Sequence, residues 1–96
     1  MNLGEALDQL DSLSDDDVVF AKRPWQLDGE ALIGRLDDQM RVPKDLAAQH
    51  FEYFIDVPVA KEVLQVFRRK PTSHERRMLM LYYAEHDEYP DWVYKE

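Results

Sequence analysis

Apolar residues at helical spacing predict a first helix over residues 3–13. This apolar stripe consists of Leu3, Ala6, Leu7, Leu10 and Leu13. Asn2 and Glu5 have the spacing of a capping box, in which each side chain bonds to the backbone N–H of the other residue. Ser14 and the three aspartates that follow it end the helix, because short polar side chains favour local hydrogen bonds over helical ones.

Two strands are predicted in the next stretch of the chain. Residues 18–21 are all apolar and predict a short strand that is buried on both faces. Pro24 ends this strand, because proline lacks the N–H that a sheet needs. Residues 31–36 fit either a helix or a strand, and Gly34 together with the turn pattern at residues 28–29 favours the strand.

The middle of the chain predicts a short helix followed by a strand. Pro43 suits the first position of a helix over residues 44–49, which are rich in Ala and Leu. Residues 50–57 alternate in the way that a strand with two different faces requires. One face would carry Phe51, Tyr53, Ile55 and Val57, and the other would carry His50, Glu52, Phe54 and Asp56.

Two further helices are predicted before an aromatic tail. A helix over residues 58–70 ends in the basic run 68–70, where cations favour the negative end of the helix dipole, and Pro71 stops it. Thr72 and Glu75 form a second capping-box pattern at the start of a last helix, over residues 73–85. We expect the tail, Tyr89-Pro90-Asp91-Trp92-Val93-Tyr94, to pack back onto the protein because it is so aromatic.

The order of these elements is helix, strand, strand, helix, strand, helix, helix, which predicts an α+β fold. We expect a small antiparallel sheet of two or three strands, covered by about four helices. A chain of 96 residues has the size of one domain, so residues 1–96 are expected to share one core.

Charge is sorted along the chain, which carries a formal net charge of −8. Residues 1–17 hold six acidic residues and no Lys or Arg, whereas residues 61–77 hold six basic and two acidic residues. Residues 78–96 are acidic again, with five acidic residues and one basic residue. Sorting of this kind produces long-range fields that steer a charged partner towards the protein.

The residues that catalysis or metal binding would need are scattered. The three histidines, at positions 50, 74 and 86, do not have the spacing of paired ligands on one helix. There is no cysteine, the three glycines are too dispersed to hold a phosphate, and no Gly-x-Ser-x-Gly pattern is present. We therefore expect a non-enzymatic protein without metal or cofactor. The lack of cysteine, of a signal segment and of a membrane-spanning segment favours a cytoplasmic location.

Several short stretches together resemble a known group of proteins. They are Val18-Val19-Phe20-Ala21, Lys22-Arg23-Pro24-Trp25, Phe51-Glu52-Tyr53-Phe54-Ile55, and the pair Tyr82-Tyr83 before Asp87. In these stretches the chain resembles a family of small, uncharacterised bacterial proteins of the kind found among the acidic immunity proteins of polymorphic toxin systems. The resemblance implies a protein that binds a cognate toxin, and it assigns no catalytic residue.

Two functions remain in view. The first is recognition and neutralisation of a protein partner, such as a basic toxin domain, by acidic side chains with tryptophan anchors. Its candidate residues are Asp15, Asp16, Asp17, Trp25, Asp87, Glu88, Asp91 and Trp92. The second is nucleic-acid binding by a basic cluster at a junction that loosely resembles a helix-turn-helix, namely Arg68, Arg69, Lys70, Arg76 and Arg77. The negative net charge opposes the second function, and the same cluster could instead hold an acidic stretch of this chain or of a partner.

Overall fold

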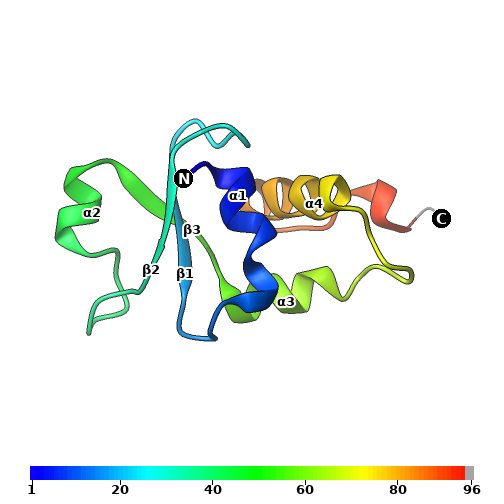
Figure 1. Ribbon diagram of the computed structural model, residues 1–96, viewed down its shortest axis with the longest axis horizontal. Helices are drawn as coiled ribbons and strands as arrows, with labels where there is room; N and C mark the ends of the chain where they lie inside the picture. Colours follow the sequence, from blue (N-terminus) through cyan, green and yellow to red (C-terminus); the bar gives the residue numbers. More distant parts are fainter. Residues whose placement is uncertain (95–96) are drawn as a thin grey trace.

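Three strands form an antiparallel sheet at the centre of the computed structural model, which describes residues 1–94 (Figure 1). β1 (Val18–Lys22) is the middle strand, with β2 (Ala31–Gly34) on one side and β3 (Phe51–Asp56) on the other. Val19 lies opposite Ile33 of β2 and Ile55 of β3, which fixes the register of all three strands.

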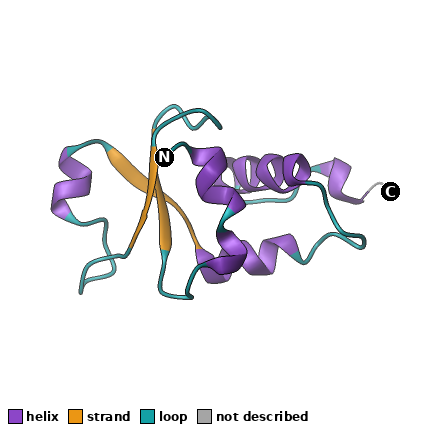
Figure 2. Ribbon diagram, in the orientation of Figure 1, coloured by secondary structure: helices purple, strands orange, loops and turns teal. Residues whose placement is uncertain are grey.

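Helices cover both faces of this sheet, and one face carries more of them than the other (Figure 2). α1 (Leu3–Asp8), α3 (Val57–Leu64) and α4 (Ser73–His86) lie together on one face. α2 (Lys44–Ala48) and the loop before it cover the other face. The short 3₁₀ turns η1 (Leu10–Ser12) and η2 (Asp91–Tyr94) follow α1 and α4. The predicted α+β fold and the predicted order of its elements are confirmed.

The core has a large part and a small part, and β1 contributes to both. Val19 and Ala21 face the three helices, where they pack with fully buried residues such as Leu7 and Leu79. The neighbouring side chains of Val18 and Phe20 point the other way, into a smaller cluster with Phe51, Leu36, Val42 and Leu46. The expectation that residues 18–21 are buried on both faces is therefore confirmed.

Side-chain caps determine where the helices begin. Both predicted capping boxes are present: Asn2 Oδ1 accepts from the Glu5 N–H at 2.8 Å, and Thr72 Oγ1 accepts from the Glu75 N–H at 3.1 Å. A third cap was not predicted. The Asp56 carboxylate accepts from the Val59 N–H at 2.8 Å, so α3 starts one residue earlier than expected.

The first helix, the second strand and the short helix before β3 are among the predicted elements that are longer than the observed ones. The first helix ends at Asp8 rather than Leu13 and continues as η1, where the Ser12 hydroxyl donates to the Gln9 carbonyl at 2.9 Å. β2 stops at Gly34 instead of Leu36. α2 ends one residue early, and Pro43 is its N-cap rather than its first residue.

The alternation predicted for residues 50–57 is wrong, because β3 contains a bulge. Phe20 lies opposite Tyr53 while Val19 lies opposite Ile55, so Phe54 is an extra residue in the pairing. The bulge turns both Phe54 and Ile55 into the large core, leaves Tyr53 exposed and places Phe51 on the opposite face.

The helix predicted over residues 58–70 is also wrong beyond Leu64. α3 ends there, and the chain runs as an irregular segment, residues 65–72, to the start of α4. Val66 and Phe67 lie outside the helix and pack against the large core. The basic run 68–70 therefore lies outside any helix, and no tight turn joins the two helices. The aromatic tail does pack back as expected, through the buried side chain of Val93.

Candidate functional site

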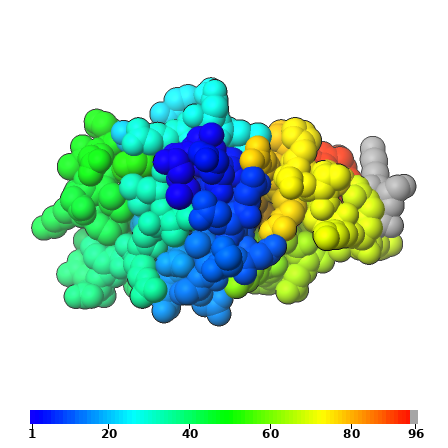
Figure 3. Space-filling model, viewed as in Figure 1, coloured from blue at the N-terminus to red at the C-terminus, as the bar shows by residue number. Residues whose placement is uncertain are grey.

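The acidic segment at the start of the chain binds the basic residues near the start of α4. Figure 3 shows this segment, in blue, against the yellow region of the chain. Both oxygens of Asp8 accept from Arg77, one of them from Nε at 2.9 Å, and Asp11 accepts from Arg76 Nη1 at 2.9 Å. These hydrogen bonds lower the pKa values of the two carboxyl groups below their ordinary range.

The aspartates 15–17, which we expected to face a partner, are partly engaged in the same way. Asp15 lies 3.5 Å from Lys61 Nζ of α3. The Asp17 carboxylate accepts from the Ser14 N–H at 2.9 Å and lies 3.6 Å from Arg35 Nε. The side chain of Asp16 is exposed. Much of the negative charge of residues 1–17 is therefore balanced by cations of the same chain.

The basic cluster does not form a helix-turn-helix. Arg69 makes a two-bonded ion pair with Glu75, and Arg76 and Arg77 bind α1 and the turn after it. Arg68 and Lys70 are exposed on the 65–72 segment and form no ion pair with any of residues 1–94. Because α3 ends at Leu64 and residues 65–72 separate it from α4, residues 68–77 are not a helix-turn-helix junction. The alternative that the cluster holds an acidic stretch of this chain is confirmed for Arg76 and Arg77.

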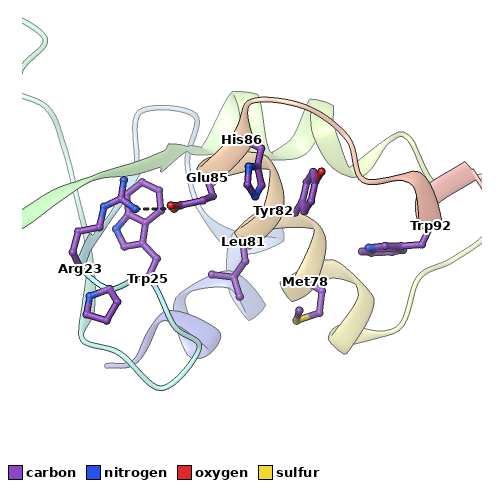
Figure 4. A pocket seen from close by; sticks show the side chains of 9 residues that line it. Arg23, Trp25, Met78, Leu81, Tyr82, Glu85, His86 and Trp92 are labelled. Carbon is purple, nitrogen blue, oxygen red and sulfur yellow. Dashed lines mark hydrogen bonds and ion pairs between the residues drawn. The ribbon is translucent and has the colours of Figure 1, made fainter.

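A groove of about 650 Å³ brings together the two tryptophans that the sequence suggested as anchors (Figure 4). Its walls come from the residues directly after β1, from the outward face of α4, and from η2. The side chains that shape it include Arg23, Trp25, Met78, Leu81, Tyr82 and Trp92. We call it the aromatic groove.

At one end of the aromatic groove a cation of the chain is already held. The Arg23 guanidinium lies over the Trp25 ring at 3.5 Å from its centroid, and Arg23 Nη1 is 2.7 Å from Glu85 Oε2. Trp25 is half-buried and stacks edge-on against Phe54, with centroids 4.8 Å apart. Core packing thus fixes Trp25, and Trp25 in turn positions Arg23.

The other end of the groove is more open. Trp92 and Met78 are 37% and 38% exposed, which is high for such large apolar residues. The Phe67 ring packs against the Trp92 ring, with ring centroids 6.1 Å apart. A smaller hollow of about 260 Å³ shares Met78 and Trp92 and extends the groove to His74 at the start of α4.

Two carboxylates lie near Tyr82 of the groove. The Tyr82 hydroxyl donates to Glu88 Oε1 at 3.4 Å. The pKa of Tyr82 is raised above its ordinary value, mainly by desolvation and further by the charges of Glu88 and Asp91. Two of the predicted acidic residues are therefore close to a side chain that lines the groove, and one of them, Asp91, directly precedes the predicted anchor Trp92 in the chain. Asp87 ends α4 in a left-handed conformation (φ 55°) and lines a different hollow, next to Tyr53.

The polar side chains that α4 contributes to the groove already contact other residues of the chain. His86 stacks on the Tyr82 ring at 4.4 Å and forms no hydrogen bond with a carboxylate of residues 1–94. The Glu85 carboxylate is bonded to Arg23. In the same range of residues, no group of three or more His, Asp or Glu side chains could hold a metal ion.

Most of the groove wall was not predicted from the sequence. Met78, Leu81 and Tyr82 were given no role beyond a place on the last helix, whereas in the structure they line the groove and Leu79 and Met80 are the buried residues of α4. The available signal was that apolar residues at positions 78–83 run around the helix, beyond what one buried face requires. A helix with a second apolar face that stays exposed indicates an interaction surface.

Comparisons of the chain with protein-family models, with curated proteins and with solved structures found no match. Within residues 1–94, no helix combines the length and the apolar character needed to cross a bilayer.

Proposed function

We propose that this protein is a non-enzymatic binding protein that recognises and neutralises a protein partner through its aromatic groove. A cognate bacterial toxin with a basic surface is the partner that the resemblance and the charge favour. The observation that carries the proposal is the exposure of Met78 and Trp92 beside the predicted anchor Trp25, in one groove with carboxylates at its open end.

Aromatic side chains in a groove of this kind are efficient anchors. Trp92 packs against Phe67 and is 37% exposed, so binding would bury the rest of it without much further ordering of its side chain. Truncation of such an anchor costs about 2 kcal/mol or more, which is roughly thirtyfold in affinity. The net charge of −8 would add to the association rate with a basic partner.

Nucleic-acid binding by the basic cluster is a weaker candidate. Three of its five members, Arg69, Arg76 and Arg77, already bond to carboxylates of the same chain. Phosphate binding would have to break these bonds while working against the negative net charge. No observation of the fold favours this function over the first.

The test is site-specific photo-crosslinking in cells that produce the protein naturally. A photoreactive amino acid at Met78, inside the groove, should give one dominant adduct, and mass spectrometry identifies the partner. The matched position is Gln49, an exposed residue at the end of α2 on the opposite face of the sheet, which should give no such adduct.

The identified partner is then purified and its affinity is measured by calorimetry. Trp92→Ala should weaken binding by at least tenfold and should abolish suppression of the partner's toxic activity in cells. Neutralising Asp15, Asp16 and Asp17 together should change the affinity less than Trp92→Ala does. Adducts with nucleic acid alone, or an affinity unaffected by Trp92→Ala, would refute the proposal.

A further inference from the structure

The end of the aromatic groove at which Arg23 lies shows which chemical group the groove can hold. We call it the occupied end. There, a guanidinium group, that of Arg23, stacks on Trp25 and bonds to the Glu85 carboxylate. An aromatic face combined with a carboxylate is a good site for a cation, because the ring quadrupole and the negative charge both attract it. This end is filled by a side chain of the protein itself.

The open end has the same two components without the cation. Tyr82 and Trp92 supply aromatic rings near Met78, and Figure 4 shows the three side chains at this end of the groove. Glu88 is 3.4 Å from the Tyr82 hydroxyl, and the charge of Asp91 also acts on that hydroxyl. No basic side chain of residues 1–94 forms an ion pair with either carboxylate.

We propose that the open end of the aromatic groove binds an arginine or lysine side chain of the protein partner, held between Tyr82 and Trp92 and neutralised by Glu88 and Asp91. The inference rests on the proposed function and specifies which feature of the partner is recognised. The flanking residues of the partner are apolar, since Met78 and Leu81 form the floor beside the cation site.

The length of the groove limits the partner segment. The lining residues of α4 run from His74 to His86, and at 1.5 Å per residue this stretch is about 18 Å long. An extended chain covers about 3.3 Å per residue, so roughly five residues fill the groove. A basic residue in the middle of a short apolar segment is therefore the predicted recognition element.

NMR titration of the intact protein tests this inference with a defined probe. The probe is the acetylated pentapeptide amide Ala-Leu-Arg-Leu-Ala, and its matched control carries citrulline, which is uncharged and nearly isosteric, in place of arginine. The chain has only two tryptophans, so the indole N–H signals of Trp25 and Trp92 report separately on the two ends of the groove. At millimolar peptide, the arginine probe should shift the Trp92 signal more than the Trp25 signal.

The expected preference for arginine over citrulline is at least fivefold in dissociation constant. The double variant Glu88→Gln/Asp91→Asn should remove this preference. Asp38→Asn/Asp45→Asn is the matched control, because it removes the same charge from exposed residues on the α2 side of the sheet, and it should keep the preference.

Three outcomes would overturn the inference. They are equal affinity for the two peptides, loss of the preference in the Asp38→Asn/Asp45→Asn control, and no shift of the Trp92 signal with either peptide. None of these would by itself refute the proposed protein-binding function, which is decided by the crosslink at position 78. The two proposals can therefore fail separately.

Discussion

Most acidic residues at the start of the chain bind cations of the same chain, whereas Glu88 and Asp91 form no ion pair with any of residues 1–94. Asp8, Asp11 and Asp15 lie against Arg77, Arg76 and Lys61, which come from α3 and α4. Glu88 and Asp91 instead lie beside Tyr82 and an exposed tryptophan. Two segments that are both acidic in the sequence thus differ in how many unpaired carboxylates they present to a partner.

This difference shows how sorted charge along a chain can serve folding and binding at once. The first acidic segment folds onto the basic segment, and opposite charges that are far apart in sequence stabilise the contact between α1 and α4. In the second acidic segment, Glu88 and Asp91 are exposed and direct their field at solvent. The sequence contains both segments but does not say which of them the basic residues will meet.

Acid should break the ion pairs of the aspartates and of Glu75 with arginine, and the loss shows how much these pairs contribute to the free energy of unfolding. The pKa values of Asp8 and Asp11 are lowered by hydrogen bonds from Arg77 and Arg76, and that of Glu75 is lowered to about 2, chiefly by Arg69. A carboxyl group whose pKa is lower in the folded than in the unfolded state stabilises the fold above its ordinary pKa. This stabilisation is lost as the pH falls, here between about pH 4.5 and pH 2.

Urea unfolding at a series of pH values measures this loss. Arg76→Ala/Arg77→Ala should be less stable than the natural protein at pH 7, and the gap should narrow as the pH falls from about 4 to about 2, because Asp8 and Asp11 become protonated in both proteins. Glu88→Gln/Asp91→Asn should change the stability at pH 7 by less than about 0.5 kcal/mol. A gap that stays constant from pH 7 to pH 2 would contradict the ion-pair account.

Removal of a single ion pair should have a smaller effect on the free energy of unfolding. Arg77→Ala removes the two-bonded pair with Asp8 and the packing of the arginine stem, and should lower the free energy of unfolding by about 1 kcal/mol. The value is modest because the side chains of Arg77 and Asp8 are 30% and 43% exposed, so water screens them. Lys70→Ala, an exposed basic residue that makes no ion pair with residues 1–94, should change it by less than about 0.5 kcal/mol. Equal losses in the two variants would show that the pair contributes nothing specific.

More of the fold than of the candidate site could be predicted from the sequence, because local sequence signals determine the helices and strands. Capping boxes, prolines and apolar spacing act over a few residues, and they placed every helix and strand in the right order. The errors came from contacts between distant residues. The bulge at Phe54 depends on pairing with β1, and the early end of α3 depends on the packing of Val66 and Phe67 against the core.

The candidate site was predicted in part. Trp25 and Trp92 were selected for their chemistry, and the fold brings them to one groove although they are far apart in sequence. The aspartates 15–17 were selected for their charge alone, and nothing in their own sequence shows that Lys61 and Arg35 lie beside Asp15 and Asp17. Chemistry that depends on a single side chain can be predicted locally, but the net charge of a surface cannot.

The smallest predicted effect concerns the glycine on which Arg77 rests. A methyl group added at Gly4 would lie 3.1 Å from both Cζ and Nη1 of Arg77 and 3.4 Å from the Leu27 carbonyl oxygen. Alanine in a helix is favoured over glycine by about 0.5–1 kcal/mol, so Gly4→Ala should stabilise α1 wherever the guanidinium is absent. With Arg77 present, the methyl group displaces the guanidinium from Asp8 and offsets this gain.

A double-mutant cycle isolates this coupling, because the contact with Leu27 is the same in both backgrounds and cancels. Gly4→Ala should leave the natural protein unchanged or slightly less stable, and should stabilise Arg77→Ala by about 0.5 kcal/mol. Urea unfolding of the four proteins gives the coupling energy directly. Additive effects would mean that the guanidinium does not sit over Gly4, and that the first acidic segment is held to α4 in some other way.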